Sequence, residues 1–416
     1  MKRPKVIPRI GKTRLLLFLA IVGPGIISGS ADNDAPGIST YSAAGGRFGY
    51  SMLWMLLIVT FSLAITQEMG ARMGIVTGQP LAALIRERFS IRITFFAVAV
   101  MLIADLGTTI GEFSGSADGF ELFGLSKYYM VPLVALLVWL LVVRGSYRFA
   151  EKAFLVLSAF YVTYVVSALL AHPSWSHALR STVVPSFQLN SSYLLLFIAV
   201  IGTTITPWGQ SFIQSYVVDK GISVKHLRYS RIDIITGAIL TDIIAAFIII
   251  ACAATIYASG GQINTAAEAA SGLAPLAGKF ASDLFAFGLL NASILAAAVL
   301  PLATSYAICG ALGFESGISR SFKEAPAFHG IYTFLIAIAA VIALIPGLPL
   351  FRIMLLSQDL NGILLPIILI FVMLLINDRR VMGKYVNGRI FNIVSWLTIG
   401  SILFLSLLLV ATSFFS

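Results

Sequence analysis

The sequence predicts an all-α polytopic membrane protein in which two five-span repeats are followed by an eleventh helix. Hydrophobic residues make up 58% of the 416 residues and charged residues only 11%, whereas soluble domains carry about 25% charged residues. The apolar residues gather in long segments. Two of these segments are interrupted by polar, proline-containing stretches at corresponding positions of the two halves.

Eleven apolar segments are long enough to cross a bilayer as helices. They cover residues 15–45, 50–77, 92–119, 128–145, 150–171, 193–218, 232–259, 282–312, 329–346, 351–376 and 387–414. We expect one transmembrane transporter domain over residues 1–416. Its repeat one covers about 15–171, repeat two about 193–376, and the extra helix about 387–414.

The positions of Lys and Arg predict the orientation in the membrane. With the N-terminus in the cytoplasm, all 28 of these residues fall on the cytoplasmic side except Arg47, Lys127, Arg180, Lys279 and Arg352. This asymmetry follows the positive-inside rule, and an odd number of spans then places the C-terminus outside. We expect a monomeric integral protein of a plasma membrane of the bacterial inner-membrane type, with the lipid bilayer as its surroundings. The net charge of +10 lies mainly in short loops, which argues against a nucleic-acid partner.

The first interruption is the stretch Asp32-Asn33-Asp34-Ala35-Pro36-Gly37 in the first span. Proline removes a backbone donor, and glycine allows the backbone to leave helical dihedral angles. An unwound segment at membrane depth must be buried in protein or line a polar cavity, and a carboxylate there indicates a functional site. Asp34 is the strongest candidate for direct coordination of a cation, with a helix cap as its structural alternative. We expect Asp32 to face a vestibule.

The second interruption, residues 202–209, has the sequence Gly-Thr-Thr-Ile-Thr-Pro-Trp-Gly and lies in the sixth span. Broken helices at the start of each half indicate an inverted-repeat transporter. Thr206 would offer a hydroxyl and a carbonyl oxygen, or would bond back to its own helix. Trp208 is expected to pack or to act as a gate.

Three polar residues of the third span, Asp105, Thr108 and Glu112, follow a spacing that places them on one helical face. Such a stripe should face the bundle interior or a water-filled cavity, although internal hydrogen bonds are the alternative. In the tenth span, Gln358 and Asn361 precede an apolar run, and we expect one or both to contact the unwound helices. Asp242 in the seventh span is a further membrane carboxylate to which the sequence assigns no role.

Neither interruption contains histidine, cysteine or methionine. Carboxylate, hydroxyl, amide and backbone oxygens suit hard cations such as Mg²⁺, Ca²⁺ or Mn²⁺. We expect Asp34 to supply the main charge and Glu112 a second one, with neutral oxygens from Thr206, the backbone near Gly37, and Gln358. No enzymatic activity and no cofactor are expected, because the metal ion is the transported substrate.

Motifs along nearly the whole chain resemble those of the Nramp divalent-metal transporters. They are Gly23-Pro24-Gly25, Asp34-Ala35-Pro36-Gly37, Phe48-Gly49-Tyr50, Ala71-Arg72-Met73-Gly74-Ile75-Val76-Thr77-Gly78, Asp105-Leu106, the sixth-span interruption and Ser357-Gln358. The resemblance implies a LeuT-type 5+5 inverted repeat with a metal site between unwound helices one and six.

Four positions depart from the usual Nramp pattern. The asparagine of the family's Asp-Pro-Gly-Asn is replaced by Gly37, the sixth-helix methionine by Thr206, the nearby histidine by Trp208 and a third-helix glutamate by Thr108. This combination resembles the branch called Nramp-related magnesium transporters. The branch shares the stretches 202–208 and 357–362 and a glutamate at the position of Glu112, but has alanine where Thr206 stands. The resemblance implies transport of largely hydrated Mg²⁺ and of Mn²⁺ without obligatory proton coupling.

Three alternatives remain open. A proton-coupled Mn²⁺/Fe²⁺ symporter would use Asp34 and Asp105 as titrating groups. A non-transporting Nramp-like sensor would be expected to carry a large soluble domain, and none is evident in this sequence. A carrier of amino acids or organic cations on the same fold is disfavoured by the first-helix carboxylate and by the bulk of Trp208.

Overall fold

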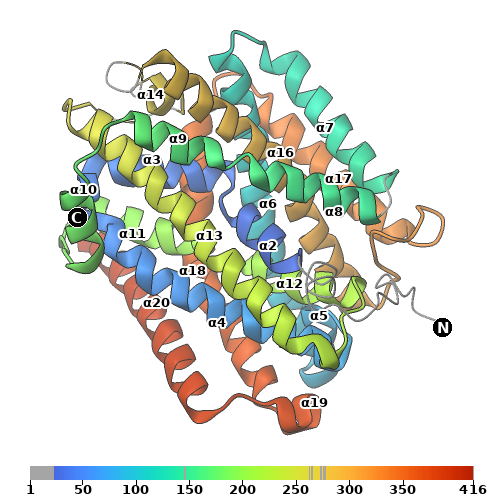
Figure 1. Ribbon diagram of the computed structural model, residues 1–416. Coiled ribbons are helices and arrows are strands. Elements are labelled where there is room, and N and C mark those ends of the chain that lie inside the picture. The colour runs from blue at the N-terminus through green and yellow to red at the C-terminus, as the bar shows by residue number, and fades with distance from the viewer. Residues whose placement is uncertain are drawn as a thin grey trace, which may run out of the picture.

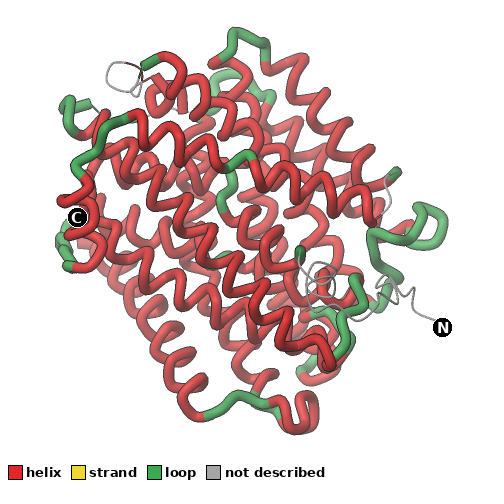
Figure 2. Tube along the Cα trace, viewed as in Figure 1, coloured by secondary structure: helices red, strands yellow, loops and turns green. Residues whose placement is uncertain are grey.

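The computed structural model describes residues 23–415, apart from 145–146, 262, 264–265, 272–273 and 275–277. The basic N-terminal stretch, residues 15–22 of the first predicted span and Ser416 lie outside the described residues. Within the described residues, helices are the only regular secondary structure (Figure 2).

Each of the eleven predicted spans coincides with a helix or a pair of helices. The first five are α2 (Pro24–Asp32) with α3 (Ala35–Phe48), α4 (Leu53–Thr77), α6 (Ile91–Leu122), α7 (Lys127–Val143), and α8 (Tyr147–Ala159) with α9 (Val162–Leu170). The other six are α11 (Ser191–Thr204) with α12 (Pro207–Asp219), α13 (Leu227–Cys252) continued by the π-helical turn η3 (Ala253–Tyr257), α16 (Lys279–Leu312), α17 (Pro326–Ala343), α18 (Leu350–Ile376), and α20 (Arg389–Phe415). Short helices and helical turns connect these spans. They are η1 (Gly49–Met52), α5 (Leu81–Arg88), α10 (Trp175–Val183), η2 (Val224–His226), α14 (Ala266–Ser271), α19 (Arg379–Met382) and η4 (Gly383–Tyr385).

Eight helical stretches of the described chain are long and apolar enough to cross a membrane, one of which joins α3, η1 and α4. Two shorter apolar helices, Lys127–Val143 and Arg389–Phe404, lie where the fourth and eleventh spans are predicted. Many large apolar side chains on these helices remain exposed, among them Phe61, Phe95 and Leu397. This is the surface that a helical protein presents to lipid.

The interrupted helices lie inside the bundle. In the most apolar window of Ser191–Asp219, 89% of the residues are buried, against 33% in the corresponding window of Phe149–Leu170. Helix α13 packs along α2, α3 and α4, and α6 packs against α16 and α18 (Figure 1). Helix α20 lies at one edge and contacts α11 and α18 (Figure 1). The broken segments are therefore enclosed by other helices, as unwound backbone at membrane depth requires.

The fifth span is broken between α8 and α9, which the sequence does not predict because neither proline nor glycine occurs there. The break places the Tyr161 hydroxyl so that it donates to the carbonyl oxygen of Asn33 at 2.9 Å. Asn33 lies between α2 and α3, where its carbonyl has left the helical ladder. The break in span five thus provides a hydrogen-bond donor for a backbone carbonyl oxygen that has no helical partner in span one.

Candidate functional site

The break in the first span is closed by a cap that the sequence itself encodes. Asp34 adopts an extended backbone, with φ −70° and ψ 173°, and precedes the first residue of α3. Its Oδ1 accepts a hydrogen bond from the Gly37 amide at 2.6 Å, while Pro36 lies in the first turn, where its missing N–H costs nothing. Asp34 is fully buried, and its Oδ2 has no hydrogen-bond partner among the described residues. One oxygen therefore caps the helix, and the other accepts no hydrogen bond from an N–H group of the described residues.

The break in the sixth span is built in the same way. Thr206 is the residue before α12, and its Oγ1 accepts from the Gly209 amide at 3.0 Å, with Pro207 as the first helical residue. The same hydroxyl donates to Asp32 Oδ1 at 3.2 Å. This bond joins the two breaks directly. The structure therefore brings together two interruptions that lie far apart in the sequence.

Glu112 of α6 reaches the first break from the side. Its Oε2 accepts from the Ala35 amide at 3.2 Å, and its carboxyl group lies close enough to that of Asp34 for direct interaction. Glu112 is fully buried, and its Oε1 lacks a partner within the described part of the chain. Two carboxyl groups, each with one oxygen that no N–H donor of the described residues reaches, thus lie within hydrogen-bonding reach of each other in a site shielded from solvent.

Glycines on α6 allow this close approach. A Cβ added at Gly111 would lie 2.5 Å from Pro36 Cγ, and one added at Gly115 would lie 2.3 Å from Ala35 Cβ. Both distances are too short for real side chains, so α6 reaches the first turn of α3 only because these positions are glycine. The spacing of the Asp34–Glu112 pair depends on this contact.

The other two residues of the α6 stripe are also buried, but they contact different helices. Asp105 Oδ2 accepts from Thr304 Oγ1 of α16 at 2.7 Å, whereas Thr108 Oγ1 accepts from Asn361 Nδ2 of α18 at 2.9 Å. The predicted stripe is therefore internal, but only Glu112 of the three bonds to the first break. Asp105 Oδ1 has no partner among the described residues.

The two predicted α18 residues are coupled to each other. Asn361 Nδ2 also donates to Gln358 Oε1, at 3.0 Å. The Gln358 oxygen is thus already occupied in this conformation, while Asn361 Oδ1 lacks a partner within the residues described. Coordination by Gln358 remains a prediction, and Asn361 offers the freer oxygen.

Gly37 contributes its backbone and has no room for a side chain. A Cβ there would lie 2.5 Å from Thr203 Oγ1 and 2.9 Å from Asp34 Oδ1. Its amide donates to Asp34, so the residue sets the orientation of that carboxylate in addition to any role as a ligand. Thr203 fills the space that an asparagine side chain, present here in the family pattern, would need.

Asp32 lies on the side of the first break that faces α4 and α12, and Trp208 belongs to the first turn of α12. Asp32 is fully buried and accepts from Thr206 at Oδ1 and from Gln67 Nε2 at Oδ2, the latter at 3.0 Å. Trp208, also fully buried, follows Thr206 in the first turn of α12 and packs edge-on against Phe212. The packing predicted for Trp208 is thus present.

A thioether that the sequence did not place near the site comes from α18. Met354 Sδ accepts from Ser39 Oγ of α3 at 3.5 Å and lies 3.3 Å from the position that a Gly115 Cβ would take. Ser39 and Gly115 both adjoin the first turn of α3. Sequence position gave no signal for this contact, because it depends on how α18 is rotated against α3.

The N-terminal end of α2 is fixed by charged groups of other helices. The carboxylate of Asp233, on α13, accepts from the amides of Gly25 at 2.7 Å and Gly23 at 3.2 Å. Beside it, Lys220 pairs with Glu151 at 2.6 Å. These contacts hold the α2 half of the first span against α8, α12 and α13.

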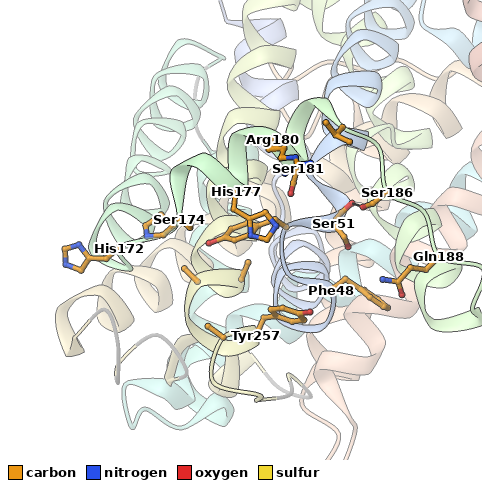
Figure 3. Close-up of a pocket in the computed structure, with 16 residues that line it drawn as sticks. Phe48, Ser51, His172, Ser174, His177, Arg180, Ser181, Ser186, Gln188 and Tyr257 are labelled. Carbon is orange, nitrogen blue, oxygen red and sulfur yellow. Dashed lines mark hydrogen bonds between the residues drawn. The ribbon is translucent and has the colours of Figure 1, made fainter.

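A cavity of about 660 Å³ lies at the other end of α3 (Figure 3). Its lining includes Phe48, His177, Arg180, Ser181 and Tyr257, and contains no Asp or Glu. The 14 residues of α3, at 1.5 Å per residue, separate this cavity from Asp34 by about 20 Å. The cavity thus lies apart from the carboxylate pair, and its lining lacks the anionic ligands of a metal centre.

No group of three or more His, Cys, Asp or Glu side chains that could hold a metal is present among the described residues. The site consists instead of a carboxylate pair surrounded by neutral oxygens. Carboxylate and neutral oxygens of this kind are the ligands that hard divalent cations take in proteins.

Comparison with known proteins shows the family to which the chain is similar. A sequence model of Nramp, described as natural resistance-associated macrophage protein-like, matches residues 25–412. The divalent metal cation transporter MntH of Verminephrobacter eiseniae is 26% identical over 416 residues, covering 96% of this chain and 90% of the relative. That of Deinococcus radiodurans is 28% identical over 407 residues, covering 93% and 87%.

Two solved structures show the fold. A manganese transporter of Eremococcus coleocola matches with a TM-score of 0.78 and 21% identity, covering 99% of this chain and 89% of that one. Mhp1, a nucleobase-cation-symport-1 family transporter in a closed conformation, matches with a TM-score of 0.58 and 15% identity, covering 93% and 90%. The predicted fold is thereby confirmed as a LeuT-type 5+5 inverted repeat with an additional helix, whereas the exact repeat boundaries remain a prediction.

Proposed function

Because the chain belongs to the Nramp family, we propose that it transports divalent metal cations, Mg²⁺ and also Mn²⁺, into the cytoplasm by alternating access and without obligatory proton coupling. The relatives named above are called divalent metal cation or manganese transporters rather than enzymes. The observation that carries the proposal is the buried pair of carboxyl groups, Asp34 and Glu112, at the first helix break, each with one oxygen that no N–H donor of the described residues reaches.

The charge of this pair matches the charge of the substrate. Two carboxylates neutralise a divalent cation, which lowers the cost of holding the ion at mid-membrane depth. Neutral oxygens from Thr206 and Asn361, and from Gln358 after release of its bond to Asn361, would complete the surroundings together with retained water. We retain Asp32, Asp105, Thr108 and Trp208 as residues of the pathway or its supporting contacts.

The preference for Mg²⁺, and the assignment to the magnesium-transporting branch of the family, rest on ligand hardness. Thr206 replaces the family's methionine, so the second break offers a hard hydroxyl oxygen in place of a soft thioether, and the bonds to Gly209 and Asp32 hold that oxygen in position. Met354 is the thioether near the first turn of α3, and it is engaged by Ser39. A hard, partly hydrated cation suits these surroundings better than a soft one.

Two parts of the structure would move during alternating access. The cap bonds of Asp34 and Thr206 leave α2 and α11 free to change direction relative to α3 and α12. The contacts of Asp233 and Lys220 hold the α2 end against α8, α12 and α13 in this conformation. If the N-terminus lies in the cytoplasm, as the distribution of Lys and Arg predicts, the α2 end would face the cytoplasm, and the cavity at the far end of α3 would face the outside.

A proton-coupled Mn²⁺/Fe²⁺ symporter is the second candidate, because the names of the relatives favour manganese and Asp105 keeps a free carboxylate oxygen. Metal-competition uptake into proteoliposomes, with the internal pH recorded at the same time, distinguishes the two. We expect Mg²⁺ uptake that Mn²⁺ competes with and that does not acidify the lumen. Acidification that follows metal uptake in a fixed ratio would reject the uncoupled mechanism, and the absence of any Mg²⁺ uptake would reject magnesium as a substrate.

A further inference from the structure

A second cavity, of about 490 Å³, lies between α4, α11 and the edge helix α20 (Figure 1). We call it the α20 groove. Its described lining is apolar or aromatic except for three hydroxyl residues, and each of these already makes a hydrogen bond. Ser62 shares a bond with Thr398 at 3.3 Å, and Ser401 donates to the Leu397 carbonyl at 2.8 Å. Cavities of this kind stay dry, and one of about 150 Å³ binds benzene, so the groove suits an apolar occupant.

The groove forms because polar bonds tie α20 and the segment before it to one half of α4. Near the C-terminal end of α4, Arg72 donates to the Tyr385 carbonyl at 2.9 Å, and Met69 Sδ accepts from Asn387 at 3.2 Å. The Ser62–Thr398 bond lies farther along α4, two turns or more from these contacts. Beyond it, towards Trp54, apolar side chains line the space between the helices.

One side of the groove is open to the surface that faces lipid. Its rim includes Phe61 and Leu397, which are 58% and 66% exposed. Its floor includes Met55, Ile201 and Ile205, which are buried in the bundle. An occupant could therefore enter sideways from the hydrocarbon of the bilayer, and no aqueous path is required.

The length of the groove matches one leaflet. Its α20 lining runs from Val394 to Phe404, which is about 15 Å along the helix and half of the roughly 30 Å hydrocarbon core. Trp54 lies at one end, where its indole N–H donates to the Ser186 carbonyl at 2.9 Å in the segment before α11. Tryptophan with an apolar body and a bonded N–H is typical of the membrane interface. The groove therefore has the position and the dimensions of a single acyl chain.

The floor of the groove reaches the second helix break. Ile201 and Ile205 are one turn apart at the end of α11, and Ile205 has left the helix, with φ −114° and ψ 90°. It is followed directly by Thr206, which caps α12. Any change in the direction of α11 at this break would therefore change the shape of the groove.

From this geometry we propose that the α20 groove binds one acyl chain of a phospholipid, drawn from the leaflet in which Trp54 lies. The chain packs on Ile201 and Ile205 and stabilises the present direction of α11, because a ligand favours the conformation to which it binds more tightly. This proposal concerns the lipid, and it does not depend on which ion the protein transports.

The test is photolabelling of the full-length protein in liposomes that contain a phosphatidylcholine with a diazirine on its acyl chain. Labelled residues are mapped by mass spectrometry. We expect label on Ile201 and Ile205, which are only 6% and 1% exposed and lie out of reach of lipid on the outer surface of the bundle. Excess unmodified phosphatidylcholine should remove this label.

Ser401→Phe should fill the groove and abolish the label on Ile201 and Ile205. Gly400→Phe is the matched control, because the neighbouring position does not line the groove and a Cβ there meets no atom within 4 Å. That variant should keep the label, and so should Ser401→Ala. As a second readout, added phosphatidylcholine should raise the melting temperature of the delipidated wild type and of Gly400→Phe in detergent, but raise that of Ser401→Phe less, since a lost site removes its binding free energy.

Three results would overturn the proposal. The first is label confined to exposed side chains such as Leu397, and the second is equal labelling of Ile205 in Ser401→Phe and Gly400→Phe. The third is a disulfide between two copies of Leu397→Cys in dilute liposomes, which would place a second copy of the chain at the groove. Label that free palmitate removes and phosphatidylcholine does not would replace the phospholipid with a fatty acid and would equally contradict the assignment.

Discussion

The two helix breaks are built in the same way but differ in the charge of their side chains. In each, a polar residue caps the second half-helix and a proline occupies its first turn, with Asp34 bonded to Gly37 at 2.6 Å and Thr206 bonded to Gly209 at 3.0 Å. The first break carries two carboxylates, and a third, that of Glu112 on α6, lies beside it. The second carries a hydroxyl and no ionisable side chain, and it is followed by the buried Trp208.

This difference separates two requirements that a transporter must meet. Both breaks supply flexible, hydrogen-bonded corners about which half-helices can move, and neutral caps are sufficient for that purpose. Only the first break supplies charge, so the affinity for a cation should depend mainly on repeat one, to which α6 also belongs. The second break should adjust selectivity, because its oxygen lies beside the ion without contributing charge.

Asp34→Ala should have the largest effect, because it removes both the free carboxylate oxygen and the cap of α3. We expect Mg²⁺ and Mn²⁺ uptake to fall to the level of protein-free liposomes. The lost cap costs only about 1 kcal/mol, so the variant should still be purified as a monodisperse protein. Asp34→Asn keeps an acceptor for Gly37 and should be equally inactive, and wild-type flux in either variant would contradict the site.

Glu112→Gln should have the next largest effect. The amide oxygen can still accept from Ala35, so the contact between α6 and α3 is retained while one negative charge is lost. We expect uptake efficiency to fall about 10–100-fold, the usual range for weakening a metal site without removing its main ligand. Initial rates of uptake over a range of Mg²⁺ concentrations measure this, and a loss below twofold would assign Glu112 a purely structural role.

Gly37→Asn restores the residue of the family pattern and should destabilise this protein. The new Cβ would lie 2.5 Å from Thr203 Oγ1, and such overpacking costs about 1–3 kcal/mol. Thermal unfolding in detergent should show a lower midpoint than the wild type. Addition of Thr203→Ala should recover part of the loss.

The control for this substitution is Gly330→Asn, because a Cβ at Gly330 meets no atom within 4 Å. Its midpoint should change much less than that of Gly37→Asn. If the two variants are equally stable, the closed position of Gly37 does not explain the departure from the family pattern.

Thr206→Met should have the smallest effect on total flux and should act on selectivity. A thioether favours softer ions, so Mn²⁺ and Cd²⁺ should compete with Mg²⁺ more strongly, while the lost cap of α12 costs about 1 kcal/mol. Thr206→Ser keeps the cap and should keep the wild-type preference. Unchanged competition curves in Thr206→Met would count against the hardness argument.

Met354→Leu tests whether the thioether of α18 contributes to the metal preference. The Met354 sulfur is engaged by Ser39 and belongs to neither break, so its removal should leave the order of metal preference as it is. A marked fall in Mn²⁺ competition would instead make Met354 a ligand and shift the selectivity of the site from the breaks to α18.

Local sequence rules were sufficient to place the eleven spans and the two breaks. Long apolar segments must form helices in lipid, because no other arrangement satisfies their backbone within a single segment. Proline and glycine beside a polar capping residue mark a place where such a helix must stop and restart. The break in span five carries neither residue and was missed, because it is stabilised by the bond of Tyr161 to Asn33 rather than by its own sequence.

The candidate site was only partly predictable for a related reason. The sequence by itself determined which ligand types the breaks contain, namely carboxylate, hydroxyl and backbone oxygens, and it placed Glu112 on an internal face. Only the tertiary structure decided that Glu112 meets Asp34, that Thr206 bonds to Asp32, that Asn361 bonds to the side-chain oxygen of Gln358, and that Met354 approaches the first turn of α3. Those pairings depend on the rotation and spacing of helices distant in sequence, set by close contacts such as Gly111 against Pro36, and periodicity within one helix carries no information about its neighbour.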